Sequence, residues 1–570
     1  MKSYNQTVDL IIQLPQTQIQ SKSVAGNLQK KLKDAGIETE SDSEPPRPAS
    51  RKMAISMNIS LPKRNVLIRT KAVDTEINPW DLAHISADAL GKDSGYIEPD
   101  FINEFTAERK IDSSAGELKA RSFGSGKSDD NFDRDWNPGS NMIWHLDDKY
   151  SQLKTARNAV ANIDYNIRIG HLDTGYSKTH FAIPDSVRND KLQRNFVRGE
   201  DPDDSHDPFS KGFMKQPGHG TGTLGLLAGT KIDIATSEGR FQDYLGGACF
   251  AEVICCRIAE SVILFKTNAF AEALNYLTEL SLSGIQVHVV SMSMGGAPSG
   301  IWADAVNAAY EAGITVVTAA GNNFAGLPIK HIVYPARFGR VIAACGVTYD
   351  FKPYSTRKKD EMQGCFGPPG YMSKALSAFT PNTPWASVES GTIRFSGAGT
   401  SSATPQIASA AAIYYRKYHR ELDRLQPWKR VEAIRNALFK SAIKKVNDKR
   451  YDNNFTNYFG NGIIQANEAL KIKVDAHLKK TPEDIVPWFP VLNTLFKKVP
   501  DKQQRIKLSM FNTELARLAY NYPEIRKIID NDMIEYDKVA RKKWNKFREA
   551  VIYHPATSVT LKKFLQEVKN

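Results

Sequence analysis

The stretch Gly397-Ala398-Gly399-Thr400-Ser401-Ser402-Ala403-Thr404-Pro405-Gln406 decides how the rest of this chain is interpreted. A glycine-rich turn delivers a serine, and an apolar run predicted to be helical, Ile407 to Tyr415, follows at once. A helix that begins at Ser401 would direct free backbone N–H groups at a negative charge formed beside the hydroxyl. A serine hydroxyl is a weak nucleophile and needs a nearby base. The stretch alone is equally consistent with an ordinary helix cap, because serine favours that position.

Three residues upstream have the chemistry that such a serine needs. Asp173 follows the apolar run Ile167–Leu172, and a carboxylate at a strand end can orient a histidine. His219 is flanked by glycines that allow close backbone approach, and its imidazole can exchange a proton near pH 7. Asn322 ends another apolar run, and its amide can donate to an oxyanion. Each of the three, taken alone, is also an ordinary turn, packed or solvated residue.

Together, in the order Asp, His, Asn, Ser, these residues resemble the motifs of the subtilisin-like serine peptidases. The matching segments are Asp173-Thr174-Gly175, Gly218-His219-Gly220-Thr221, Ala319-Ala320-Gly321-Asn322 and Gly399-Thr400-Ser401-Ser402-Ala403-Thr404-Pro405. The resemblance implies that Ser401 attacks a peptide carbonyl, that His219 takes and returns the proton, and that Asp173 holds His219. It also implies that Asn322 and the Ser401 backbone N–H bind the oxyanion. The expected activity is a serine endopeptidase that acts on protein or peptide substrates.

The same resemblance extends to substrate binding. Ser291 to Gly296 is similar to the segment on which the family lays its substrate as an added strand. The expected substrate-binding residues are Ser293, Met294, Gly295, Gly296, Ala320 and Gly321. Gln406 and Thr404 depart from the family pattern, where many members have His and Ser, and neither is expected to touch the chemistry.

No cofactor and no metal ligand is expected for this chemistry. Some members of the family bind calcium, and Asp201 to Asp207 is an acidic stretch that could hold it. A solvated acidic loop is the simpler interpretation, because these carboxylates lack a recognised ligand spacing.

The order of apolar and polar segments predicts four regions. Residues 1–105 read as a small α+β region, 106–143 as an exposed linker, 144–472 as the peptidase domain, and 473–570 as a basic helical extension. Within the peptidase domain, short apolar strands alternate with helices, which predicts an α/β fold with a parallel sheet covered on both faces. The predicted strands there are 167–172, 252–258, 287–291, 314–319 and 341–347. The predicted helices are 150–162, 222–228, 268–281, 302–312, 405–418 and 428–441, and those of the extension are 488–496, 512–520, 525–534 and 536–552.

The N-terminal region carries a further resemblance. Tyr96-Ile97-Glu98-Pro99-Asp100 is similar to the closing segment of the family's N-terminal inhibitory propeptides. Residues 1–105 would then occupy the cleft of the peptidase domain. A permanent accessory domain is the equally open alternative. Ile55–Leu61 and Asn65–Ile68 are expected to pair as strands.

Composition limits the surroundings and partners of the 570-residue chain. Its five cysteines, an odd number without metal-ligand spacing, fit a reducing compartment. With no secretory signal and no apolar run long enough to span a membrane, we expect a cytoplasmic location and no membrane partner. Residues 473–570 hold 20 Lys and Arg against 12 Asp and Glu, within a net charge of +13. We expect these helices to dock a regulatory protein of the peptidase; in one alternative, the protein is a partner-binding protein in which these helices carry the main role. An alternative reads Arg541 to Arg548 as a nucleic-acid surface of basic and aromatic residues, although a solvated basic helix face is the simpler explanation.

Overall fold

The computed structural model describes most of the chain. The described residues are 7–14, 24–39, 63, 65–71, 77–101, 141–188, 191–210, 215–236, 239–262, 266–323, 330–357, 361–388, 391–495, 501–529 and 539–567. The predicted linker and the predicted strand Ile55–Leu61 lie outside these residues, apart from Asn141–Ile143. No helix among them is both long and apolar enough to cross a membrane.

The peptidase region is built on a seven-stranded parallel sheet with the order β13-β12-β11-β10-β5-β9-β6. Its strands are almost wholly buried, as expected for a sheet covered on both faces. The predicted α/β fold is therefore confirmed. The strands are β5 (Arg168–Asp173), β6 (Arg194–Asn195), β9 (Glu252–Arg257), β10 (Val289–Met292), β11 (Thr315–Ala319), β12 (Val341–Val347) and β13 (Ala375–Phe379).

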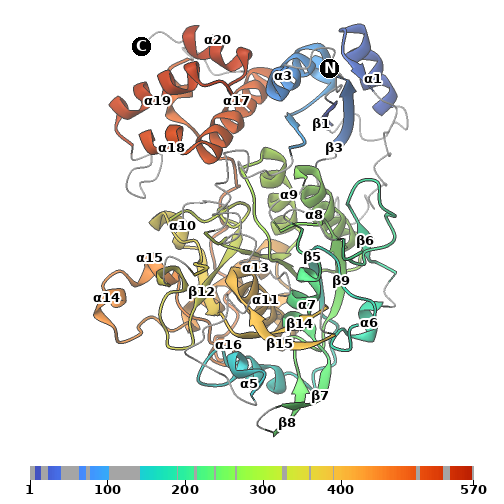
Figure 1. The fold of residues 1–570 in the computed structure, drawn as a ribbon, viewed down its shortest axis with the longest axis vertical. Helices are drawn as coiled ribbons and strands as arrows, with labels where there is room; N and C mark the ends of the chain where they lie inside the picture. Colours follow the sequence, from blue (N-terminus) through green and yellow to red (C-terminus); the bar gives the residue numbers. More distant parts are fainter. Residues whose placement is uncertain are drawn as a thin grey trace.

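Helices cover the two faces of the sheet and form two separate cores (Figure 1). On one face lie α8 (Thr267–Leu282) and α9 (Gly300–Glu311). On the other lie α5 (Leu153–Ala159), α7 (His219–Ala228), α11 (Gly399–Lys417) and α13 (Pro427–Ser441). Shorter helices are α6 (Asp185–Arg188), α10 (Pro369–Met372), α12 (His419–Leu422), α14 (Lys449–Asp452), α15 (Phe455–Phe459) and α16 (Ala466–Ala469).

Several boundaries differ from the expected ones. Helix α7 begins at His219 rather than at residue 222, and α11 begins at Gly399 rather than at Pro405, so His219 and Ser401 lie inside first helical turns. Two hairpins and two edge strands of the main sheet, β6 and β13, were not predicted. The hairpins are β7 (Lys231–Thr236) with β8 (Gly239–Tyr244), and β14 (Thr383–Ser387) with β15 (Thr392–Gly397).

The N-terminal region is a small α+β unit whose sheet has the order β2-β3-β1-β4. Strand β1 (Thr7–Gln13) is central and pairs antiparallel with both β3 (Asn65–Lys71) and β4 (Ile97–Pro99). The remaining elements are β2 (Glu38–Thr39), α1 (Val24–Asp34) and α3 (Pro79–Leu90). The expected pairing of residues 65–68 is therefore made by the first strand of the chain.

The C-terminal region is helical, as predicted. It contains α17 (Lys502–Asn521), α18 (Pro523–Ile529), α19 (Arg541–Tyr553) and α20 (Val559–Glu567) around a core of its own. The predicted helix 488–496 is only a 3₁₀ segment, Pro490–Leu495. Trp544 and Phe547 of α19 are buried in this core, so they are not the exposed stacking surface that the nucleic-acid alternative needs.

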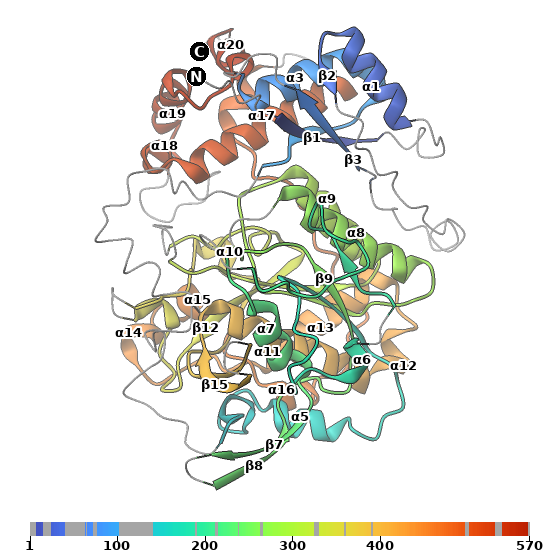
Figure 2. The same ribbon diagram turned by 45° about the vertical axis from the view of Figure 1, so that its right-hand side comes forward.

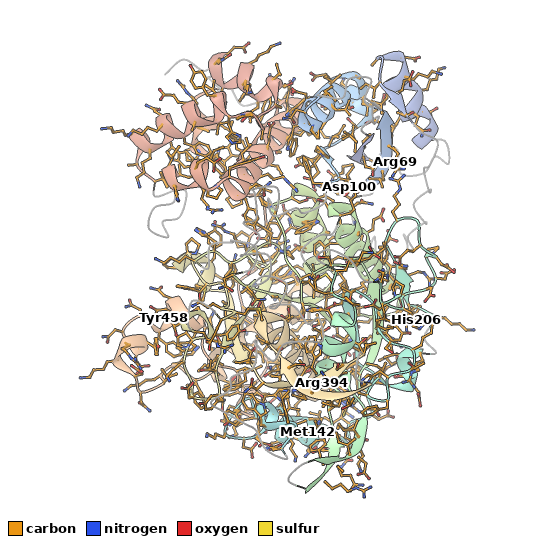
Figure 3. The ribbon with its side chains drawn as sticks, viewed as in Figure 1. Arg69, Asp100, Met142, His206, Arg394 and Tyr458 are labelled. Carbon is orange, nitrogen blue, oxygen red and sulfur yellow. The ribbon has the colours of Figure 1, made fainter. Side chains whose placement is uncertain are left out.

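The N-terminal unit sits on the peptidase domain through carboxylates at two helix N-termini. Asp100 Oδ1 accepts a hydrogen bond from Asn268 N at 2.9 Å, at the start of α8. Glu98 Oε2 accepts one from Gly300 N at 3.1 Å, at the start of α9. First-turn N–H groups have no partner within their own helix, so the carboxylates satisfy them and complement the helix dipoles. Asp100 is labelled at this boundary in Figure 3.

The C-terminal helices lie beside the N-terminal unit, above the peptidase domain (Figure 2). Asp81 of α3 accepts hydrogen bonds from Val559 N and Thr560 N, both at 2.8 Å, at the start of α20. The Tyr96 hydroxyl lies within hydrogen-bond distance, 2.7 Å, of Thr513 Oγ1 of α17. The two ends of the chain therefore form one continuous layer.

Candidate active site

Asp173 and His219 form a directly bonded pair. Asp173 ends β5, His219 begins α7, and His219 Nδ1 lies 2.7 Å from Asp173 Oδ1. The Asp173 side chain is fully buried and that of His219 is 13% exposed. Burial alone would raise the pKa of Asp173, but His219 and the hydrogen bonds to the carboxylate hold that pKa below its usual value. An ionised carboxylate only accepts, so Nδ1 carries the proton and Nε2 is left to act as a base.

The sequence did not indicate two residues, Thr223 and His171, that support the Asp173 carboxylate. Thr223 Oγ1 donates to Asp173 Oδ2 at 3.0 Å and also contacts His171 Nε2 at 2.9 Å. Burial lowers the pKa of His171 to about 4, so this histidine is neutral near pH 7. His171 lies within β5 and belongs to the buried surroundings of the candidate site.

Close packing explains the glycines around His219. A Cβ on Gly220 would fall 2.0 Å from the carbonyl oxygen of Gly175, and one on Gly222 would fall 1.9 Å from the Trp385 ring. Trp385 also meets the His219 ring edge-on, with centroids 5.6 Å apart. The first turn of α7 can therefore approach both the end of β5 and the hairpin β14–β15 only without side chains at these positions.

Asp207 was interpreted as part of a solvated acidic loop, and for this residue that interpretation is wrong. Its side chain is buried, and Oδ2 accepts hydrogen bonds from Gly218 N at 2.7 Å and from Thr174 Oγ1 at 3.3 Å. It thereby joins the residue after Asp173 to the residue before His219. No sequence motif marks it, because its two partners are 33 and 11 positions away.

Two other acids of this loop contact basic side chains. Asp203 lies 3.3 Å from Arg194, and Asp204 pairs with His206, which is labelled in Figure 3. Across the described residues, no group of three or more His, Cys, Asp or Glu is arranged to hold a metal ion. The described part of this loop therefore provides no support for a calcium site.

Ser401 lies in the first turn of α11 and is linked twice to Ser293. The Ser401 hydroxyl donates to the Ser293 carbonyl at 3.2 Å, and the Ser293 hydroxyl donates to the Ser401 carbonyl at 3.0 Å. The second bond has a cause in the sequence. Pro405, four residues on, has no N–H to offer the Ser401 carbonyl, and Ser293 provides the missing donor.

Asn322 is held against the same helical turn. Its Oδ1 accepts a hydrogen bond from Thr400 N at 3.0 Å, which leaves Nδ2 as the donor that an oxyanion requires. A Cβ on Gly399 would lie only 2.9 Å from that Nδ2, so the amide rests on the glycine backbone. Thr400 Oγ1 also bonds to the backbone of Gly321.

The structure thus joins the predicted residues in three pairs: Asp173 with His219, Ser401 with Ser293, and Asn322 with Thr400. Helices α7 and α11 pack against each other. Among the described residues, the Ser401 hydroxyl is bonded to Ser293 and makes no hydrogen bond to His219. Catalytic hydrogen bonds often tighten only when substrate binds. The individual catalytic roles therefore stay predictions.

The predicted substrate-binding residues follow the ends of two neighbouring strands. Ser293, Met294, Gly295 and Gly296 come after β10, and Ala320 and Gly321 come after β11. Such strand ends are where open α/β sheets bind ligands. Ser291 and Met292 lie within β10 and pair with strands on both sides, so an added substrate strand could use only the residues beyond them.

The two departures from the family motif are buried and tie α11 to its surroundings. Gln406 Nε2 donates to the Phe379 carbonyl of β13 at 2.8 Å. Thr404 Oγ1 donates to the Thr400 carbonyl at 2.8 Å. Both bonds are to backbone groups, which agrees with the expectation of structural rather than chemical roles.

Sequence comparisons agree with this fold and site. A sequence model of the Subtilase family matches residues 164–462. Among curated proteins, the chain is 27% identical over 312 residues to subtilisin DY of Bacillus licheniformis and 28% identical over 306 residues to subtilisin Savinase of Lederbergia lenta, covering 54% of this chain and 91% of each relative. Subtilisin E of Bacillus subtilis (strain 168) is 26% identical over 271 residues, covering 47% and 60%.

These matches define a serine peptidase, a hydrolase with an α/β fold. Because the family model matches more than half of the chain, the protein belongs to the subtilase family. The N-terminal unit and the C-terminal helices lie outside the matched residues.

Proposed function

We propose that the protein is a serine endopeptidase that cleaves peptide bonds through Asp173, His219 and Ser401. The observation that carries the proposal is the 2.7 Å bond between His219 Nδ1 and a fully buried, ionised Asp173. That bond fixes the imidazole and stabilises its cation.

In the proposed reaction, substrate binding turns the Ser401 hydroxyl from Ser293 toward His219 Nε2. His219 removes the proton as the oxygen attacks the peptide carbonyl, and the tetrahedral oxyanion forms beside Asn322 Nδ2 and the Ser401 backbone N–H. His219 then passes the proton to the leaving amine, which leaves an ester on Ser401. Water, activated by His219, hydrolyses that acyl-enzyme and regenerates the serine.

We further propose that the N-terminal unit is a propeptide-like inhibitory domain. Its Glu98 hydrogen-bonds Ser299 and Gly300, which follow the substrate-binding residues Ser293–Gly296 closely in sequence. An element docked there restricts access to the same backbone that a substrate would use. A permanent accessory domain would make the same contacts, so loss of inhibition on undocking is the distinguishing property.

The C-terminal helices are proposed to keep this inhibitory domain in place. Arg517 of α17 is fully buried, donates to the Pro298 carbonyl at 3.2 Å, and lies 4.5 Å from the Phe101 ring centroid. It therefore contacts the peptidase domain and the N-terminal unit at once. The expected regulatory protein partner would then act by loosening this junction.

We propose an intracellular, cytoplasmic location. All five cysteines lie in described residues and are free thiols, four of them buried. Free thiols are typical of proteins in a reducing compartment.

The test compares wild type, Ser401→Ala and the control Ser409→Ala by intact mass and by labelling with a serine-directed fluorophosphonate. Ser409 lies on the same helix, and its hydroxyl contacts the Leu227 carbonyl. We expect labelling of Ser401 in wild type and in Ser409→Ala, and none in Ser401→Ala. Equal labelling of all three proteins would contradict the proposed nucleophile.

A further inference from the structure

The two segments that follow β10 and β11 both begin beside the first turn of α11, which carries Ser401. Ser293 is bonded to Ser401, and Gly321 is bonded to Thr400. The predicted substrate-binding residues Ser293–Gly296 and Ala320–Gly321 therefore begin next to one another, and a space between them would lie beside Ser401 and Asn322. This space is the candidate pocket for the residue that precedes the cleaved bond.

A third segment, Ile332–Tyr334, bridges these two walls. Val333 N donates to the Ala320 carbonyl at 2.9 Å. Tyr334 exchanges two backbone hydrogen bonds with Gly296, at 2.7 and 3.1 Å. Because the segment is bonded to one wall on each side, it forms the floor of the space between them.

The Val333 side chain fills the space above that floor. A Cβ on Gly295 would fall 2.1 Å from Val333 Cγ2, and a Cβ on Gly321 would fall 2.7 Å from Val333 Cγ1. Real atoms do not approach that closely, so the two methyl groups rest directly on the glycines of both walls. Val333 is 3% exposed, and Cys365 Sγ lies beside Gly321 as well. The two glycines thus make room for Val333 rather than for a large substrate side chain.

We infer that Val333 is a specificity-determining residue that restricts cleavage to bonds following small residues, such as glycine, alanine or serine. The inference rests on the proposed peptidase function and names its substrate class. An aromatic side chain would have to displace two buried methyl groups held between fixed backbone walls. Overpacking of this kind is costly, whereas an alanine methyl needs no such displacement.

The experiment uses the full chain and tetrapeptide p-nitroanilides that differ only in the residue before the cleaved bond, with alanine compared to phenylalanine. Matching peptidyl diphenyl phosphonates, read by intact mass, report the same preference even when few molecules are active. We expect wild type to favour alanine by about tenfold or more in kcat/KM, and Val333→Gly to lower that ratio by about 10- to 100-fold. Val333→Ala should give an intermediate ratio.

A matched control is Val317→Ala, a buried valine within β11. It should lower stability without changing the alanine-to-phenylalanine ratio, and because the ratio is internal to one sample, loss of folded protein does not affect it. Wild type that reacts through Ser401 but prefers phenylalanine, or an unchanged ratio in folded Val333→Gly, would overturn the inference alone. Absence of any Ser401-dependent reaction with either series would overturn the proposed function, and the inference with it.

Discussion

Two fully buried carboxylates, Asp173 in the candidate active site and Glu98 at the domain junction, have pKa values that are shifted in opposite directions. The pKa of Asp173 is lowered and that of Glu98 is raised. Burial raises both, but Asp173 has a directly bonded histidine, whereas the attraction of Arg517 and the hydrogen bonds from Ser299 and Tyr96 do not offset burial at Glu98. For these two carboxylates, the groups that they contact, rather than the extent of their burial, decide the direction of the pKa shift.

The lowered pKa of Asp173 favours a permanent negative charge in the candidate site, whereas the raised pKa of Glu98 makes a change of charge at the junction easier. In the proposed reaction, Asp173 remains an anion and holds the His219 cation that forms. The junction carries a second carboxylate of the same kind, because burial raises the pKa of Asp100 to about 6. The sharpest tests therefore change one region and measure both.

The largest expected effect comes from removing the charge of Asp173. Asp173→Asn should lower kcat by about 10⁴-fold, because the amide favours the wrong histidine tautomer. Glu98→Gln should leave the chemistry of Ser401 unchanged, because Glu98 contacts only the junction. Phosphonate labelling rates of Ser401 measure both. An equal loss of the labelling rate in Glu98→Gln would contradict the view that the junction and the candidate site act separately.

Removing Arg517 should have the next largest effect, on docking rather than chemistry. Arg517→Ala removes the buried cation that attracts Glu98 and donates to the Pro298 carbonyl, so docking should weaken by more than in the control below. In a Ser401→Ala background, hydrogen exchange of β1 and β4 should accelerate while that of β5 does not. The control is Lys507→Ala on the same helix, whose exposed pair with Asp88 is worth about 1 kcal/mol or less. Equal acceleration in both variants would contradict a special role for Arg517.

Asp207→Ala tests positioning within the active-site region. The change leaves the buried Gly218 N–H without its acceptor, at a cost of about 1–3 kcal/mol in the free energy of unfolding. We expect kcat to fall with little change in KM, because Asp207 holds the turn before His219 and no substrate. Chemical denaturation and steady-state kinetics measure the two effects, and a rise in KM alone would point instead to substrate binding.

The smallest expected effect is a pH dependence of docking. Because the docked pKa of Asp100 is raised from 3.8 to about 6, docking takes up a proton and is favoured by acid. The contribution is present at low pH and is lost as pH rises through about 6, roughly tenfold in the docking equilibrium between pH 5 and 7.5.

The groups that face Asp100 are Lys266, Asp9, Arg198 and the Asn268 N–H. Asp9 titrates below this range, because Arg69, Lys266 and Arg198 outweigh its burial and lower its pKa. Hydrogen exchange of β4 in Ser401→Ala, corrected for intrinsic rates, checks the prediction. Asp100→Asn should abolish the dependence, and persistence of it in that variant would assign it elsewhere.

The fold and the class of enzyme could be predicted from the sequence because their signals are local. The apolar runs before Asp173 and Asn322 mark strands, and glycines mark the close approaches around His219 and Ser401. Helix starts were misplaced, because a glycine-rich segment such as Gly399–Ser401 has low intrinsic helix propensity and becomes helical through packing.

The sequence could not reveal contacts between residues that lie far apart in the chain. Asp207 looked like one of several loop acids, and only folding brings it to Thr174 and Gly218. Val333 lies in an ordinary apolar run, and nothing local places it against Gly295 and Gly321. The helical nature of the extension was predictable from its pattern, but its contact with the N-terminal unit was not.

The hydrogen bond between Tyr96 and Thr513 joins residues 417 positions apart. On a ribosome that adds about 5–20 residues per second, Thr513 emerges about 20 to 80 seconds after Tyr96. The proposed restraint on the peptidase is therefore completed last, after Ser401 has been made. A chain that terminates before α17 would carry the whole peptidase fold without this contact, and under the proposed regulation the order of translation would contribute to control of the enzyme.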